Sequence, residues 1–345
     1  MNVNWKRRRV LQLSGALVLS SFLPRWGRAE IPILTGPTMG TRFKVQTHHV
    51  PDGLYLPKLK RAIEQVFRNT ESLMSTYRSD SELSLFNAST STDWQPILTD
   101  TARVAETALK VQRQSRGAFN PASGSLVNHW GFGAKPSFVA DVSKTPPTQV
   151  LASVHDANIE LKPGYIRKDN PQAMLDLNGI AKGDAIDGVA TLLEQTGIAD
   201  YLIEIGGEIR ARGSGPEGAE WRVGLENPTD SVLTTIRIGE KSVATSGDYV
   251  NYFMRNGIRY SHVVDPRAGK PIDHNLASVS VVADTAMQAD AWATALLVMG
   301  LEEGYRHAQR NSMAAFFLQR DGAGYRSTMT SEFEQLIVNS TGFSA

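Results

Sequence analysis

The sequence predicts an α+β fold in which helices and antiparallel strands are mixed. Segments with the spacing of amphipathic helices and segments that alternate like half-buried strands both occur, but they do not follow each other in the strict alternation of a parallel Rossmann sheet. The 345 residues are 41% hydrophobic, which is ordinary for a soluble protein with a full core. No run of eighteen apolar residues is present, so we expect no membrane span.

The first half of the chain contains the clearest helical patterns. Residues 56–74 and 101–115 each place apolar side chains on one helical face. Residues 38–47 alternate like a strand. The polar segment 79–99 predicts short elements at best, and the glycines and prolines of 132–147 predict a loop.

The second half is predicted to be richer in strands. A strand at 173–177 is expected to lead through a tight turn with Gly179 and Gly183 into a helix at 184–195. Two helices are expected at 287–299 and 300–311. Further strands are expected at 159–161, 201–205, 208–212, 221–226, 233–238, 242–245, 249–255, 258–264, 278–282 and 314–319.

The first 29 residues have the layout of an export signal. Basic residues at 6–9 precede a mostly apolar run at 10–23, and a small-residue site ends at Ala29. The two arginines at 7–8 and the apolar pair at 10–11 resemble a twin-arginine signal. We therefore expect cleavage after Ala29 and a periplasmic domain at 30–345. Losing six basic residues and no acidic residue lowers its formal charge from +1 to −5.

Composition also excludes several classes of function. The absence of cysteine excludes disulfides, cysteine-bound zinc, iron–sulfur clusters, thiol nucleophiles and a lipidated N-terminal cysteine. The near-neutral charge gives no indication of a nucleic-acid partner. Residues 213–218 match G-x-G-x-x-G, but they contain Pro216 and precede a predicted strand, so we interpret them as a loop. The His48–His49 pair is expected to be solvated.

Three segments carry residues suited to chemistry. In 176–187, backbone N–H groups and Lys182 could hold a phosphate at a helix start. His262 is suited to proton transfer near neutral pH. Asp290 and Thr294 lie one helical turn apart, and their oxygens suit a hard cation such as Mg²⁺. Each has a structural alternative: a surface lysine, a structural histidine, or a carboxylate that complements a helix N-terminus.

Glycine-rich turns at 39–41, 117–121, 205–208 and 244–249 could let a ligand approach the backbone. Together and in this order, these segments resemble the ApbE family of flavin transferases. The resemblance runs from Met39 to Gly300 and implies a T-fold-like α+β architecture. It is carried by MGTRF, MSTYRSDSELS, GAFNPASG, DLNGIAKGDAID, IEIGGEIRARG, VATSGDYVNYF, YSHVVDPRAGKPI and ADAWATALLVMG.

The resemblance implies an enzyme that binds FAD, uses Mg²⁺, splits the pyrophosphate and attaches FMN to a threonine of a partner protein. The partner would be a membrane-associated redox subunit. By motif, Asp290, Thr294 and the Gly179 carbonyl would hold the metal. His262 would activate the threonine, and Lys182 would stabilise the departing AMP. The residues that would contact FAD are Met39, Tyr77, Ala118, Phe119, Asn120, Asp176, Lys182 and Val264.

Two alternatives remain open alongside this interpretation. One is a periplasmic FAD pyrophosphatase, which would use the same metal site with water as nucleophile. The other is a non-catalytic periplasmic flavin-binding protein. Asn120 stands where the family motif frequently has an aspartate, which leaves the role of this position open. The acceptor motif is not evident in the chain, so we expect a donor enzyme rather than a flavinylated acceptor.

Overall fold

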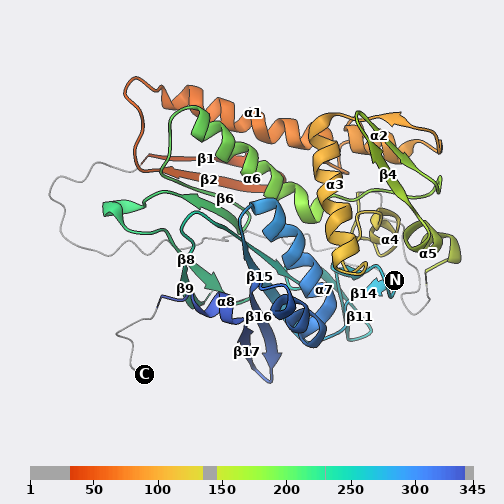
Figure 1. Ribbon diagram of the computed structural model, residues 1–345. Coiled ribbons are helices and arrows are strands. Elements are labelled where there is room, and N and C mark those ends of the chain that lie inside the picture. The colour runs from red at the N-terminus through yellow and green to blue at the C-terminus, as the bar shows by residue number, and fades with distance from the viewer. Residues whose placement is uncertain (1–31, 135–145, 230, 339–345) are drawn as a thin grey trace, which may run out of the picture.

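The structure is a computed structural model that describes residues 32–134, 146–229 and 231–338. An eight-stranded sheet in the order β1-β2-β6-β7-β10-β15-β16-β17 forms its centre, and each strand is antiparallel to its neighbours (Figure 1). The sheet and its helices confirm the α+β prediction. The strands are Ile33–Thr38 (β1), Thr41–Thr47 (β2), Tyr201–Ile205 (β6), Glu208–Arg212 (β7), Ser242–Gly247 (β10), Leu276–Ala283 (β15), Ala314–Asp321 (β16) and Gly324–Met329 (β17).

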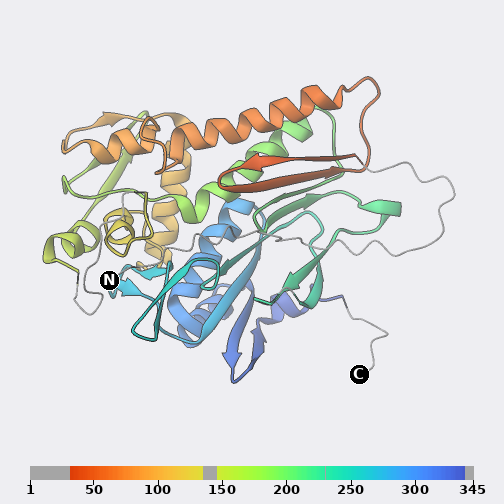
Figure 2. The ribbon, with the colours of Figure 1, turned by 180° about the vertical axis from the view of Figure 1, so that it is seen from behind.

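Helices cover one face of this sheet, and a hairpin covers part of the other (Figures 1 and 2). Side chains alternate along each strand. Val45 and Ile203 therefore pack with α1 and α6, whereas Leu202 and Val243 pack with the opposite layer. The sheet is thus buried on both faces. The covering elements are α1 (Leu56–Met74), α6 (Asn178–Gln195) and α7 (Ala286–Arg310) on one face, and β8 (Arg222–Glu226), β9 (Val232–Arg237) and α8 (Ser331–Glu334) on the other.

A smaller, mainly helical lobe packs against α6 and α7. Its core contains Phe119 and Val104, which share a cluster with Ile180 of α6 and Ala291 of α7. Two further hairpins lie between this lobe and the sheet. The lobe consists of α2 (Glu82–Ala88), β3 (Gln95–Pro96), α3 (Thr99–Gln114), α4 (Gly124–His129), α5 (Thr148–His155), β4 (Ile159–Lys162) and β5 (Tyr165–Lys168). The hairpins are β11 (Tyr252–Arg255) with β12 (Ile258–Ser261), and β13 (Val264–Asp265) with β14 (Lys270–Pro271).

The largest correction concerns the segment before α6. Residues 173–177 form no strand beyond a bridge from Met174 to Ser123, and α6 begins at Asn178 rather than at 184. Gly179 and Gly183 are therefore helical, not part of a turn. The reason is packing: a Cβ on Gly183 would lie 2.3 Å from the carbonyl oxygen of Ala286, so glycine allows α6 and α7 to approach closely.

Other boundaries differ in ways that local geometry explains. The strand predicted at 38–47 contains the last residue of β1, a turn at Met39 and Gly40, both with positive φ, and the whole of β2. The prediction of two helices at 287–299 and 300–311 is confirmed in substance, because α7 is interrupted at Gly300, whose backbone (φ +75°, ψ 178°) is not helical. The strand predicted at 249–255 begins only at Tyr252, and that predicted at 258–264 is divided between β12 and β13.

Several expectations are confirmed. Helix α1 has the predicted bounds, and α3 differs from its prediction by two residues at the start and one at the end. The glycine-rich match at 213–218 contains a short 3-10 turn and leads to strand β8, so it lacks the helix of a dinucleotide fingerprint. Of the His48–His49 pair, His49 is exposed beside Asp200, whereas His48 is half-buried with its Nδ1 enclosed, so the expected solvation holds only for His49. The proposed signal at 1–29 and most of the predicted loop at 132–147 lie outside the described residues.

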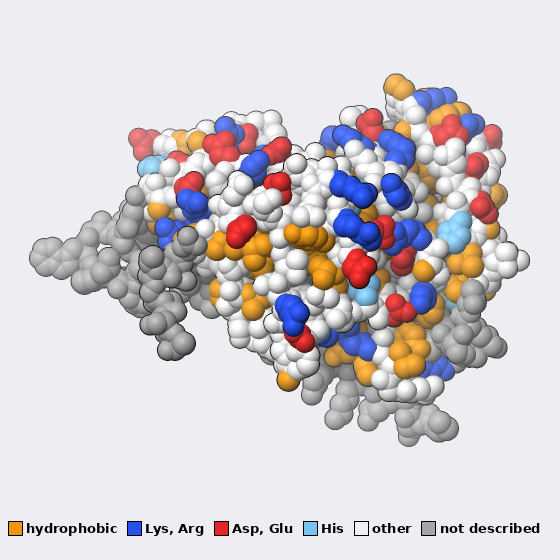
Figure 3. All heavy atoms as spheres, turned by 60° about the horizontal axis from the view of Figure 1, so that its bottom comes forward, with side chains coloured by type: hydrophobic (Ala, Val, Ile, Leu, Met, Phe, Trp, Pro, Cys, Tyr) orange, Lys and Arg blue, Asp and Glu red, His pale blue; other side chains and the backbone are white. Residues whose placement is uncertain are grey.

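Basic side chains at the ends of α3 and α7 are exposed, and Lys and Arg side chains gather on the face seen in Figure 3. Arg113 and Arg310 lie in the last turns of these helices, where positive charge complements the helix dipole. Arg113 and Arg310 therefore have a local structural role. None of the described helices combines the length and apolarity that crossing a bilayer requires.

Candidate functional site

A cleft of about 410 Å³ lies where the sheet, the helix pair α6–α7 and the smaller lobe meet. This volume is in the range of small-molecule and cofactor sites. All twelve residues that the sequence predicts for the site line this cleft, although they come from distant parts of the chain. They are Met39, Tyr77, Ala118, Phe119, Asn120, Asp176, Gly179, Lys182, His262, Val264, Asp290 and Thr294.

A buried charge cluster forms the floor of the cleft. Lys182 of α6 donates to the carboxylate of Glu208 at the start of β7, and its Nζ lies 3.9 Å from Asp290 Oδ1. Both carboxylates are 3% exposed. Burial disfavours the charge on Lys182, but the two carboxylates outweigh burial and raise the pKa of its ammonium. Lys182 therefore remains a cation.

The cluster contains two carboxylates, Glu208 and Asp290, but only one ammonium group, that of Lys182. Burial raises the pKa of both Glu208 and Asp290, and Lys182 only partly opposes this. Glu208 Oε2 is buried and has no hydrogen-bond partner in the structure. A buried group of this kind is costly unless a further positive charge or donor compensates it. The cluster therefore fits an additional cation.

The oxygens beside this cluster suit a hard metal ion. Thr294 Oγ1 lies one helical turn from Asp290 and 3.0 Å from Ser246 Oγ. Gly179 faces the same hydroxyl, since a Cβ there would lie 3.3 Å from Thr294 Oγ1. No group of three or more His, Asp or Glu side chains with metal-ligand spacing occurs within 32–134, 146–229 and 231–338. This is compatible with Mg²⁺, which commonly uses one or two carboxylates and completes its shell with phosphate oxygens and water.

Helices α6 and α7 are held together directly at this cluster. The N–H of Gly183 donates to Asp290 Oδ2 at 3.2 Å. One turn further along α6, the carboxylate of Asp187 accepts from the N–H groups of Ala286 and Met287, both at 3.0 Å, and pairs with Arg210. Asp187 thus caps α7 from a neighbouring helix and satisfies two otherwise unpaired N–H groups.

His262 approaches the cleft from the opposite side, directly after β12. Its Nδ1 lies 2.9 Å from the carbonyl oxygen of Asn251, which also accepts the His262 backbone N–H at 3.0 Å. Because a carbonyl only accepts, Nδ1 carries the proton and Nε2 is left with a free lone pair. Burial lowers the pKa of His262 against weaker opposing effects of Asn251 and Asp248. The neutral imidazole is the form that can act as a base.

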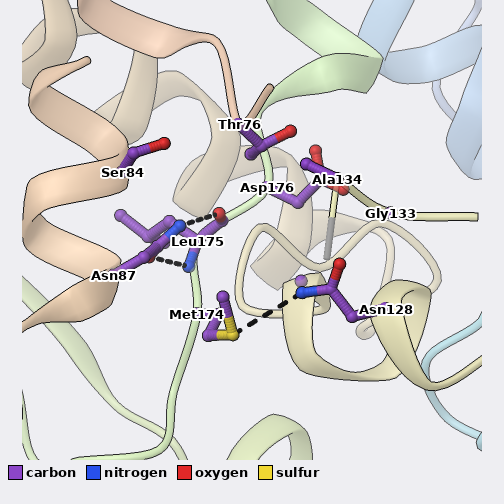
Figure 4. Close-up of a pocket in the computed structure, with 10 residues that line it drawn as sticks. Thr76, Ser84, Asn87, Asn128, Gly133, Ala134, Met174, Leu175 and Asp176 are labelled. Carbon is purple, nitrogen blue, oxygen red and sulfur yellow. Dashed lines mark hydrogen bonds between the residues drawn. The ribbon is translucent and has the colours of Figure 1, made fainter. Parts of the chain in front are cut away.

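The smaller lobe contributes the third side. Asp176 is anchored by its neighbours: Leu175 exchanges two hydrogen bonds with the Asn87 side chain, at 2.7 and 2.8 Å, as in a strand pair (Figure 4). Asp176 Oδ1 accepts from the N–H of Asn178 at 2.9 Å, next to the start of α6. Burial raises the pKa of Asp176. A water-sized pocket of about 20 Å³ behind this segment is too small for the cleft's ligand.

Asn120 has a structural explanation. Its Nδ2 donates to the Val154 carbonyl at 3.2 Å, and its Oδ1 accepts from the Ala122 N–H at 2.9 Å. An aspartate could accept the second bond but could not donate the first. The amide therefore ties the 117–121 turn to α5, which positions Phe119 beside Gly179.

Sequence reasoning missed several residues of the site. Glu208, Ser246, Asn178 and Asn251 line the cleft, and Asn87 supports it from behind. Glu208 is the most important of these, because it pairs with Lys182. The glycine turn at 205–208 indicated this part of the chain, but no pattern in the sequence identified Glu208 as the partner of Lys182.

The comparisons with known proteins identify the family of the chain. A model of the ApbE family matches residues 39–317. The chain is 37% identical over 314 residues to the FAD:protein FMN transferase of Vibrio cholerae, a match that covers 90% of this chain and 93% of that protein.

Two solved structures are similar at 34% identity and a TM-score of 0.80. One is the flavin transferase ApbE from Vibrio cholerae, and the match covers 90% of this chain and 100% of the Vibrio chain. The other is the apo form of the flavinyl transferase ApbE from Pseudomonas stutzeri, and the match covers 89% of this chain and 96% of the Pseudomonas chain. These matches extend over the cleft and both of its helices. The chain therefore belongs to the ApbE family and is a transferase.

Proposed function

We propose that the protein is an FAD:protein FMN transferase, which splits FAD in a Mg²⁺-dependent reaction and attaches FMN through a phosphoester to a threonine of a partner protein. The observation that carries this proposal is the meeting of three chemistries in one cleft. These are the oxygen set of Asp290 and Thr294, the ammonium of Lys182, and a histidine with a free Nε2.

The proposed reaction balances as a displacement at phosphorus. The threonine oxygen bonds to the FMN-side phosphorus, and the bond from that phosphorus to the oxygen of the AMP half breaks. The hydroxyl proton moves to Nε2 of His262, and AMP leaves with the bridging oxygen. A threonine hydroxyl is a weak nucleophile at its ordinary pKa, which is why a positioned base is needed.

The chain's own residues divide the remaining work. Mg²⁺ held by Asp290, Thr294 and the Gly179 carbonyl would neutralise charge on the pyrophosphate. Lys182 supplies a fixed positive charge for the departing phosphate, and Glu208 orients it. The Asn251 carbonyl keeps the His262 ring in the tautomer that accepts a proton. Met39, Tyr77, Ala118, Phe119, Asn120, Asp176 and Val264 line the rest of the cleft and would contact FAD.

One assay separates this function from its two rivals. The protein without residues 1–29 is incubated with FAD, Mg²⁺ and a protein acceptor, and the products are examined for in-gel flavin fluorescence and for AMP. Fluorescent acceptor with equimolar AMP is the expected result. AMP without labelled acceptor indicates a pyrophosphatase, and tight FAD binding without either product indicates a binding protein.

We also propose that residues 1–29 direct export to the periplasm and that the acceptor is a membrane-associated redox subunit. The support is the arrangement of basic and apolar residues before Ala29 and the family resemblance. Fusing residues 1–29 to a folded reporter tests the export step. The reporter is expected in the periplasm, and replacing Arg7 and Arg8 by lysine is expected to retain it inside the cell.

A further inference from the structure

The β11–β12 hairpin, which ends next to His262, is not part of the central sheet (Figure 1). Within the described ranges, β11 and β12 pair only with each other. Their ladder pairs Tyr252 with Ser261. At the next position, the Asn251 carbonyl accepts both bonds from His262. The ladder therefore fixes the His262 ring within the hairpin, but it does not fix where the hairpin lies relative to the sheet and to the proposed metal site on α7.

A buried carboxylate beside the hairpin supplies a link to the sheet. Asp248 directly follows β10 and is 3% exposed. Its side chain accepts from Arg259 of β12 and, through two guanidinium nitrogens, from Arg320 of β16. A buried carboxylate is costly unless positive charges and donors compensate it, and these two side chains do so. One carboxylate thus connects the hairpin to a strand of the central sheet that is 72 positions away along the chain.

The main chain of Asp248 is held as well. Its N–H donates to the Ala277 carbonyl of β15 at 3.0 Å, and its own carbonyl accepts from Arg259 and from the Ser261 hydroxyl. The loop from β10 to β11 contains no helix or strand, so these contacts determine its course. We refer to Asp248, Arg259 and Arg320 as the Asp248 cluster. The cluster joins this loop, the hairpin and the central sheet.

The Asp248 cluster can act on the reaction only through the hairpin. None of its three residues lines the cleft, whereas Asn251 and His262 do. On the side of the smaller lobe, the hairpin is held by ring contacts such as that of Phe253 with Phe132 at 5.4 Å. A guanidinium that donates through two nitrogens to one carboxylate has a more specific geometry than such a contact. The cluster is therefore the contact best suited to set the position of the hairpin.

We propose that the Asp248 cluster positions His262 for proton transfer. Arg320 anchors Asp248 to the sheet, Asp248 holds β12 through Arg259, and Nε2 of His262 is thereby kept within reach of the acceptor hydroxyl. This inference rests on the proposed function, in which His262 takes the hydroxyl proton, and it adds positioning residues that lie outside the cleft. A base must lie within hydrogen-bond distance of the proton that it accepts, and a displacement of about 1 Å can lower a rate about 100-fold.

Arg320→Gln tests the cluster without leaving a buried charge unpaired, because Asp248 keeps Arg259 as its partner. Arg320→Lys retains the positive charge but cannot form the contact through two nitrogens. Arg326→Gln is the matched control. Arg326, on the adjacent strand β17, pairs with Asp321, but these two side chains are 71% and 54% exposed, and exposed pairs contribute little. Urea unfolding followed by circular dichroism measures the stability of each variant.

Transfer is measured with a flavin-free redox subunit that the wild-type protein labels, at saturating concentration. We expect Arg320→Gln to lower kcat at least about tenfold with an unchanged KM for FAD. Arg320→Lys should lose less, and Arg326→Gln should match the wild type. The same substitutions are then made in a His262→Gln background. Arg320→Gln should have no further effect on kcat there, because the base that it positions is already absent.

The other outcomes are distinguishable. A wild-type kcat in Arg320→Gln overturns the positioning role and leaves the transferase function intact. An equal fall of kcat in both backgrounds also overturns it, because Arg320 would then act without His262. A rise in the KM for FAD alone would place the effect on FAD binding instead. If Arg320→Gln does not unfold cooperatively, Arg320→Lys decides the same comparison. If the wild-type protein splits FAD but labels no acceptor, the proposed function itself fails, and this inference fails with it.

Discussion

The two sides of the cleft are built in different ways. On the α6–α7 side, the carboxylates of Glu208 and Asp290 are buried beside the half-buried Lys182. Hydrogen bonds from Gly183 to Asp290 and from Ala286 to Asp187 connect the two helices. On the β11–β12 side, the His262 ring depends on one carbonyl, and large apolar side chains face solvent. A highly charged pyrophosphate needs fixed, desolvated charges, because these gain most where water is excluded. A protein acceptor instead needs an accessible surface.

This contrast predicts that substitutions on the two sides act on different measurements. Changes at α6–α7 should affect stability, metal dependence and turnover together, because the same contacts serve all three. Changes on the β11–β12 side should affect proton transfer at His262. Single substitutions test this difference between the two sides. We expect their effects to be largest at the proposed metal site and smaller farther from it.

Asp290→Ala should have the largest effect. It removes a carboxylate from the proposed metal site, and we expect transfer to fall by about 100-fold or more. The fold should survive, because Lys182 and Glu208 then balance each other in charge. In-gel fluorescence measures transfer, and cooperative urea unfolding followed by circular dichroism measures the fold. Undiminished transfer with Mg²⁺ present would contradict the metal assignment.

Asp187→Ala should destabilise the protein by about 2–3 kcal/mol, because two N–H groups of α7 and Arg210 lose their partner. The Mg²⁺ concentration for half-maximal transfer should rise as α7 shifts, and Asp187→Asn should retain part of the cap. Asp273→Ala, which breaks an exposed pair with Lys270, is the control and should cost less than about 1 kcal/mol. Equal losses of stability in Asp187→Ala and Asp273→Ala would contradict the role of Asp187 as a cap of α7.

Gly183→Ala should cost about 1–2 kcal/mol through overpacking, since its Cβ would meet a backbone carbonyl that cannot move without separating α6 from α7. Gly188→Ala in the same helix meets only Val66 Cγ1 at 3.0 Å, a side chain that can rotate. The higher helix propensity of alanine should offset that contact. Urea unfolding of both variants measures the difference in stability. If the control Gly188→Ala loses as much stability as Gly183→Ala, the packing argument is contradicted.

The pH dependence should report His262 on the other side. Burial lowers its pKa from the ordinary value of 6.5, so the neutral base persists as the solution becomes more acidic. The acidic limb of kcat/KM should therefore have its midpoint below pH 6.5. In the same range, stability falls with decreasing pH, because the unfolded histidine binds protons more readily than the folded one. His262→Gln should remove this limb, and an unchanged profile would assign the proton to another group.

Local sequence patterns determined a large part of this molecule. The apolar spacing of 56–74 specified α1 to the residue, because a helix that lies on a sheet needs one continuous apolar face. The ordered motifs also identified twelve residues that now line one cleft. Family resemblance could do this without any knowledge of the fold, since each motif is short and contiguous.

Only the tertiary structure decided which of these residues contact one another. Lys182 pairs with Glu208, 26 positions away, and Gly183 donates to Asp290, 107 positions away. No periodicity encodes such a pairing, because it depends on strand order and on how closely two helices approach. The same reason explains why Gly183 was predicted in a turn. Its missing side chain serves contact with α7, which a one-dimensional pattern does not contain.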